Sequence, residues 1–188
     1  MKSSNHFQSR TSKLVTSALF CALIILGTYI RLPFPIPITL QLVFTNVSAL
    51  LLGAKWGAVP SLLYLACRLI GIPVFSYGGF SFDGGVAGVL SVSFGFVVGF
   101  AAGAFLASLI NDRAKFKHKD VVASAVNLLC VYLFGTVHYA ILCNFYLLEQ
   151  TTLSELIYVC IIPFILPDII KLWASIILYR KLKTVRTK

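Results

Sequence analysis

The sequence predicts an all-α integral membrane protein with six transmembrane helices, built as a single domain over residues 1–188. Hydrophobic residues make up 59% of the chain and charged residues only 12%, whereas ordinary soluble domains are about 25% charged. The apolar residues are gathered into six long runs, and most basic residues lie between these runs. This arrangement is typical of a protein that crosses a membrane several times.

A helix needs about 20 mostly apolar residues to cross a hydrocarbon core of roughly 30 Å. By this criterion the predicted spans are residues 14–32, 38–53, 55–72, 86–109, 121–148 and 156–180. The second is short, which predicts a shallow or tilted span, and the fifth is long enough to project beyond the bilayer. The first run has no convincing cleavage site, so we expect it to be the first helix of the mature protein and not a signal peptide.

The basic residues predict the orientation of the chain. Thirteen of the 16 Lys and Arg residues lie before the first span, between spans two and three, between spans four and five, or after span six. Cytoplasmic loops retain positive charge, so both termini are predicted to be cytoplasmic. Because the net charge of +10 comes from these separate clusters and not from one basic face, the sequence argues against nucleic-acid binding.

The sequence lacks the motifs of several common kinds of active and metal-binding site. The sequence contains no GxxxxGK[ST] loop for ATP, no HExxH or Cys/His cluster for a metal, and no GxSxG nucleophile elbow. The five cysteines form no CxxC pair and lie in apolar runs, where they are expected to be small buried hydrophobes. His138 is expected to be a hydrogen-bonded packing residue. The sequence therefore predicts no metal, no cofactor and no enzyme active site.

The run IIPFILPDIIKLWAS, residues 161–175, carries an acid and a base, Asp168 and Lys171. A charge at the bilayer centre costs roughly 2.5–3.5 kcal/mol on insertion scales, so such a pair is a candidate functional site. The two prolines of this run predict that the regular helix begins near Pro167, with Asp168 at its N-terminus and Lys171 on the same face. A purely structural ion pair that closes the bundle is the alternative.

Two predicted outer loops add polar groups. Residues 73–85, PVFSYGGFSFDGG, are rich in glycine and aromatic residues and contain one acid, Asp83. Residues 31–41, RLPFPIPITLQ, are stiffened by three prolines and end with Thr39 and Gln41, which enter the next span as hydrogen-bonding groups. Either loop alone is explained as a connection with locally satisfied polar groups. Together with the acid–base pair, they converge on the predicted outer half of the protein.

Ala18 and Ala22 lie four residues apart in TSALFCAL of the first span. Small residues at this spacing let a second helix approach closely in a membrane. The pair therefore indicates helix packing, without identifying the partner.

Residues 35–75, PIPITLQLVFTNVSALLLGAKWGAVPSLLYLACRLIGIPVF, together with GFVVGF and PDIIK, resemble the BioY family. The most specific parts are P-x-T-L-Q at residues 37–41, L-L-G-x-x-x-G-A at residues 51–58, L-I-G-x-P-V-F at residues 69–75, and Asp168-x-x-Lys171. BioY proteins are the biotin-specific substrate-binding subunits of energy-coupling factor (ECF) transporters. The resemblance covers roughly residues 14–180.

The resemblance implies a six-helix subunit of a prokaryotic plasma membrane that encloses one biotin as its transported ligand. It also implies a transmembrane coupling subunit, which would dock on the Ala18 and Ala22 face, and two separate ATPase subunits. Biotin offers two N–H donors, a carbonyl and a carboxylate beside apolar groups. Residues suited to it are Asp168, Lys171, Asp83, Gln41 and Thr39 for hydrogen bonds, with Phe75, Tyr77, Phe80 and Phe82 as walls.

The chain departs from the family at two places. SVSFGF, residues 91–96, stands where members often carry a stretch like GPTGGY, and the loop before it is longer. Arg68 stands at a position that is usually small or apolar, as a local ion-pair partner or as a ligand to the biotin carboxylate. The alternative functions are a subunit for a different vitamin, which would share the fold and the alanine face, and an intramembrane enzyme.

Overall fold

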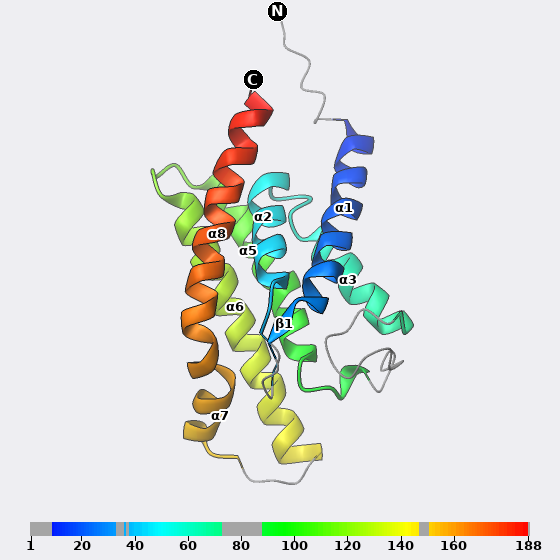
Figure 1. Ribbon diagram of the computed structural model, residues 1–188, viewed down its shortest axis with the longest axis vertical. Coiled ribbons are helices and arrows are strands. Elements are labelled where there is room, and N and C mark those ends of the chain that lie inside the picture. The colour runs from blue at the N-terminus through cyan, green and yellow to red at the C-terminus, as the bar shows by residue number, and fades with distance from the viewer. Residues whose placement is uncertain (1–8, 33–35, 37, 73–87, 147–150, 188) are drawn as a thin grey trace, which may run out of the picture.

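Each of the six apolar runs contains helix in the computed structural model, which describes residues 9–32, 36, 38–72, 88–146 and 151–187 (Figure 1). The helices are α1 (Arg10–Tyr29), α2 (Gln41–Leu52), α3 (Val59–Ile70), α5 (Phe94–Arg113), α6 (Lys119–Ile141) with its π-helical continuation η2 (Leu142–Tyr146), α7 (Leu153–Cys160) and α8 (Ile162–Thr187). Strands β1 (Arg31–Leu32) and β2 (Ile38–Thr39) pair antiparallel between α1 and α2. The predicted all-α class is confirmed, with this short ladder as an addition.

The helices fall into two length classes. Four helical segments, Arg10–Tyr29, Phe94–Arg113, Lys119–Tyr146 and Leu153–Val185, are long and apolar enough to cross a membrane. Helices α2 and α3 have 12 residues each, which gives each a length of about 18 Å and leaves it shorter than the hydrocarbon core. The second predicted span is therefore short, as expected, and the third is short as well.

The bundle is organised around the α5–α6 hairpin and α2. Helices α5 and α6 pack along each other, while α2 contacts α1, α5, α6 and α8. Figure 1 shows that α1 begins and α8 ends at the same end of the bundle, with α7 at the opposite end. The first helix therefore begins where the last one ends, while the cytoplasmic location of this end stays a prediction.

Small residues explain the close contact between α5 and α6. At Gly103, a Cβ atom would lie 2.3 Å from Oδ1 of Asn127 and 2.7 Å from its backbone oxygen. Such distances leave no room for a side chain. Without a hydrophobic driving force in lipid, this close packing of small residues is what holds two membrane helices together.

The turn between α2 and α3 belongs to the L-L-G-x-x-x-G-A motif. Gly53 ends α2 with φ +80°, a conformation that favours glycine. The next residue, Ala54, donates its N–H to Oδ2 of Asp112 at 2.7 Å. A side chain of α5 therefore anchors the turn, which explains why the motif lies at a helix end.

The surface and the interior have the polarity expected in lipid. Helix α8 exposes large apolar side chains, including Ile170 and Trp173. Polar groups are instead buried between helices: Asn46 donates to Ser124 Oγ at 2.8 Å and to Ser175 Oγ at 2.6 Å. This inversion relative to soluble proteins agrees with a membrane protein.

The start of the last helix differs from its prediction. Helix α8 begins at Ile162, with Pro163 in its first turn, and it continues through Pro167. The prediction of a start near Pro167 was therefore wrong. A proline inside a helix removes one backbone hydrogen bond and need not end the helix when neighbouring helices hold it. Asp168 consequently lies beyond the first helical turn and not at a helix N-terminus.

Candidate substrate-binding site

A cavity lies in the middle of the bundle, between β2 and helices α2, α3, α5, α6 and α8. Its lining combines apolar and aromatic walls with a few polar groups: Ile36, Ile38, Thr39, Gln41, Leu42, Tyr64, Ser93, Phe96, Val97, Phe100, Val131, Tyr132, Phe164, Asp168 and Lys171. Ligand sites commonly have this composition. The cavity volume is about 50 Å³, which admits a few water molecules, so a larger ligand requires the wall side chains to move.

Asp168 and Lys171 form a buried ion pair in this cavity. Oδ1 of Asp168 contacts Nζ of Lys171, and the two residues are only 5% and 8% exposed. The hydroxyl of Tyr132 on α6 donates to Oδ2 of Asp168 at 2.8 Å. Lys171 also donates to the backbone oxygen of Thr39 at 3.1 Å. Three segments distant in sequence therefore meet at this pair.

The P-x-T-L-Q motif forms the neighbouring wall. The hydroxyl of Thr39 donates to Oε1 of Gln41 at 2.9 Å. Thr39 therefore hydrogen-bonds to Gln41 with its side chain and to Lys171 with its backbone oxygen. Nε2 of Gln41 is buried and has no hydrogen-bond partner among the described residues. A buried donor left unsatisfied costs about 1–3 kcal/mol. In a cavity wall, it is suited to a ligand acceptor.

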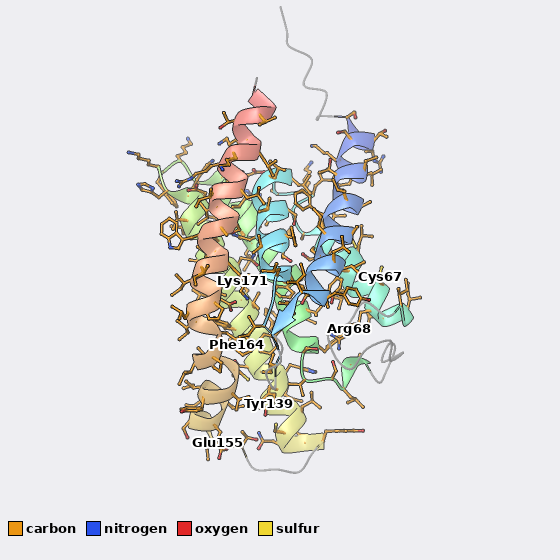
Figure 2. All side chains as sticks on the ribbon, viewed as in Figure 1. Cys67, Arg68, Tyr139, Glu155, Phe164 and Lys171 are labelled. Atoms are coloured by element: carbon orange, nitrogen blue, oxygen red, sulfur yellow. The ribbon has the colours of Figure 1, made fainter. Side chains whose placement is uncertain are left out.

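Ser93, which directly precedes α5, supplies a second such group. Its Oγ atom is buried without a hydrogen-bond partner in the described part of the chain, and Ser93 lines the cavity. The rings of Phe96 and Phe164, which also line the cavity, lie 6.3 Å apart and form an apolar wall. Figure 2 shows Phe164 and Lys171 on the side of α8 that faces the other helices. The cavity thus offers charged, hydrogen-bonding and aromatic surfaces to one occupant.

Arg68 lies apart from the Asp168–Lys171 pair, near the end of α3 (Figure 2). It is 1% exposed, donates to the backbone oxygen of Gly88 at 2.7 Å and contacts the hydroxyl of Ser91. Its guanidinium lies 5.1 Å from the centre of the Phe94 ring. Arg68 does not line the cavity described above. It instead holds the segment that leads to Ser93 and α5.

The remaining site predictions have different outcomes. Asp83, Phe75, Tyr77, Phe80 and Phe82 lie outside the described residues. His138 is a hydrogen-bonded packing residue as predicted: its Nε2 atom lies 3.2 Å from the backbone oxygen of Ser91, and its ring packs on Phe94. All five cysteines are free, and only Cys67 is not fully buried. Among the described residues, no group of three or more His, Cys, Asp and Glu could hold a metal.

Sequence reasoning missed the apolar wall of the cavity and three of its hydroxyl-bearing residues, Tyr64, Ser93 and Tyr132. Tyr64 is 1% exposed, and its hydroxyl lies 3.4 Å from that of Thr28. The available signal was a hydroxyl inside an otherwise apolar span, which needs a partner once buried. That signal does not say which of many such residues faces the cavity, because the sequence does not reveal helix rotation.

Ala18 and Ala22 lie on the outer surface of α1. Both are exposed, whereas Ser17, Phe20, Cys21 and Ile24 face the bundle. The exposed strip between them includes Leu19, which is 58% exposed. The two alanines therefore do not line the cavity and are available to another helix.

Comparisons with known proteins agree with this architecture. The model of the BioY family matches residues 1–188. The probable biotin transporter BioY of Lysinibacillus sphaericus is 32% identical over 95% of this chain and 90% of that protein. The biotin transporter BioY of Thermotoga maritima is 29% identical over 94% and 98% of the two chains.

A solved structure is similar as well. The S-component for biotin from an ECF-type ABC transporter superposes with a TM-score of 0.77 at 26% identity, covering 93% of this chain and 92% of that one. The similarity thus extends over nearly the full length in both sequence and structure. Together with the family match, it shows that this chain belongs to the BioY family.

Proposed function

We propose that this chain is the biotin-binding membrane subunit of an ECF-type importer. The observation that carries the proposal is the buried Asp168–Lys171 pair in an apolar cavity that also contains Gln41 and Ser93, each with a buried polar atom that has no partner among the described residues. The relatives are named biotin transporters, and the similar structure is an S-component for biotin. The protein binds its ligand without converting it.

The chemistry of biotin matches the cavity. Its ureido ring presents two N–H donors and a carbonyl, which an aspartate and a lysine or amide can satisfy. Its thiophane ring and valeryl chain suit walls such as Phe96, Phe100 and Phe164. Without ligand, Asp168 and Lys171 neutralise each other. With ligand, part of this ion pair is exchanged for hydrogen bonds to biotin.

The proposed topology places both termini in the cytoplasm of a multi-pass protein of the prokaryotic plasma membrane. The α1 surface that contains Ala18 and Ala22 docks on the transmembrane coupling subunit, and two separate ATPase subunits hydrolyse ATP. Exposure of both alanines supports this role, because a strip of small residues allows close approach of a partner helix. The cavity and this docking surface are distinct.

A panel of ligands tests the proposed specificity. Melting temperature of the purified protein should rise with biotin and with desthiobiotin, which keeps the ureido group. Lipoate, which keeps the valeryl carboxylate but lacks that group, should have a much smaller effect, as should thiamine and riboflavin. A shift with another vitamin and none with biotin would assign the subunit to that vitamin. Conversion of a ligand to a product would indicate an intramembrane enzyme.

A further inference from the structure

A second pocket, remote from the central cavity, lies at the end of the bundle where α1 begins and α8 ends. It has a volume of about 310 Å³ and lies between the ends of α5 and α8 and the start of α6. Its lining is mostly basic and polar: Asn111, Lys117, His118, Lys119, Asp120, Tyr179, Arg180 and Lys183. Four of these eight residues are Lys or Arg, and one is acidic. The pocket is therefore suited to an anion.

The single acid of this lining is already engaged. Oδ2 of Asp120 accepts from Nε of Arg180 at 2.7 Å, and Oδ1 accepts from the backbone N–H of Val121 at 3.0 Å. Asp120 thus neutralises Arg180, and the lining holds no other acid to face Lys117 and Lys119, whereas Nζ of Lys183 lies 5.7 Å from the centre of the Tyr179 ring. Bringing an anion between these lysines would reduce their mutual repulsion.

The floor of the pocket adds one acceptor and one donor. Asn111 is 5% exposed; its Nδ2 atom donates to the backbone oxygen of Leu50 at 2.9 Å and to the hydroxyl of Tyr179 at 3.3 Å. Its Oδ1 atom is buried and has no partner among the described residues. Because the oxygen of Tyr179 accepts from Asn111, its own hydrogen can be donated to a ligand. The floor thus suits a group that carries both an anionic oxygen and a hydroxyl.

The position of the pocket favours a lipid as the source of that group. It lies at the ends of three helical segments long enough to cross a membrane, which is where headgroups are found. Close in sequence to its lining residues Asp120 and Lys183, apolar side chains are exposed on two helices: Val122 is 43% exposed and Leu182 is 37% exposed. A headgroup in the pocket would place its acyl chains along such side chains, whereas a free phosphate would not use them.

We propose that this pocket binds the headgroup of an anionic, hydroxyl-bearing phospholipid such as phosphatidylglycerol. The lysines hold the phosphate, Tyr179 donates to one of its oxygens, and Oδ1 of Asn111 accepts from the glycerol hydroxyl. Figure 1 shows α8 and α1 well separated at this end of the bundle. None of the residues that line the pocket belongs to α1, so the pocket is distinct from the alanine face of that helix.

The main test compares two triple variants of equal charge. In the pocket variant, Lys117, Lys119 and Lys183 are each replaced by Gln; in the control, Lys13, Lys55 and Lys181, which do not line the pocket, are replaced in the same way. Native mass spectrometry of the full chain in neutral detergent then measures binding of phosphatidylglycerol and phosphatidylcholine. A lysine close to an anionic lipid raises binding affinity by about fivefold. Loss of three such lysines should therefore lower the affinity of the pocket variant for phosphatidylglycerol by about a hundredfold.

The wild-type protein and the control should prefer phosphatidylglycerol over phosphatidylcholine, and melting temperatures confirm that both variants are folded. Equal losses in the two triple variants, or no preference between the two lipids, would overturn the proposal. Phosphatidylmethanol has the same charge without the hydroxyls and should bind several-fold more weakly than phosphatidylglycerol; Tyr179→Phe should weaken both anionic lipids. If glycerol 3-phosphate displaces the lipid at comparable concentration, the site takes a soluble phosphate and the lipid assignment is wrong.

Discussion

Asp168 and Lys171 differ from an ordinary structural ion pair in what surrounds them. Each has a further partner on a distant segment, Tyr132 for the carboxylate and the backbone of Thr39 for the ammonium. The other ion pair among the described residues, Asp120–Arg180, lies far from the cavity and has a half-exposed arginine. This second pair provides a control for any change at the first.

Replacing either member of the cavity pair should weaken biotin binding. A hydrogen bond to a charged group contributes roughly 1.5–3 kcal/mol, so Asp168→Asn or Lys171→Met should lower affinity by about one to two orders of magnitude. Arg180→Gln should leave affinity unchanged. Biotin affinity and melting temperature are measured on the same samples.

A purely structural pair predicts a different pattern. Each single variant would then melt at a lower temperature and bind biotin normally, because one buried charge is left without its partner. The double variant, with neither charge, would regain stability. Normal affinity in both folded single variants would therefore refute the assignment of the pair to the ligand site.

Ser93→Ala should affect stability and binding in opposite directions. The buried hydroxyl has no partner among the described residues, so its removal relieves an unsatisfied group and should keep or raise the melting temperature. If biotin hydrogen-bonds to Ser93, affinity should fall by about threefold to tenfold, the equivalent of one neutral hydrogen bond. Ser61→Ala is the control, because it removes another buried hydroxyl that has no partner in the described part of the chain and does not line the cavity. Unchanged affinity in Ser93→Ala would exclude this contact.

At the scale of helices, α1 has a buried face and an exposed face. Its buried face packs on α2 and α3, and its outer face exposes Ala18 and Ala22. We expect the double substitution Ala18→Leu and Ala22→Leu to block close approach of a partner helix. Biotin uptake by cells that contain the complete transporter should fall, while biotin binding by the purified subunit should remain normal.

Ala125 supplies the matched control for α1. It is exposed on α6, and Ala125→Leu makes the same substitution once on a different outer surface. Uptake in this variant should be close to wild type. Loss of biotin binding in a folded α1 variant, or equal loss of uptake in the α6 variant, would show that the alanines do not define the docking face.

At the scale of the whole molecule, the two ends of the bundle should face opposite sides of the membrane. Lys117 lies between α5 and α6 at the end near the chain termini, and Thr152 precedes α7 at the other end. In a background without native cysteines, Thr152→Cys should react with a membrane-impermeant reagent applied to intact cells, and Lys117→Cys should react only after lysis. The reverse pattern would invert the proposed topology.

Much of the fold could be predicted from the sequence because a backbone in lipid must satisfy its hydrogen bonds internally. Long apolar runs therefore become helices, and all six were found. The start of α8 was mispredicted because neighbouring helices tolerate Pro167, which is tertiary information. The β1–β2 ladder involves two residues per strand, too few for any periodic signal.

The sequence by itself determined the membrane class and the helical runs, and it singled out Asp168 and Lys171 as candidate site residues, because charges in apolar segments are costly. Only the tertiary structure decided their partners. Tyr132 is 36 positions from Asp168 in the sequence, and Thr39 is 132 positions from Lys171. Such convergence depends on helix rotation and packing, which are set by contacts between segments and leave no local pattern along the chain.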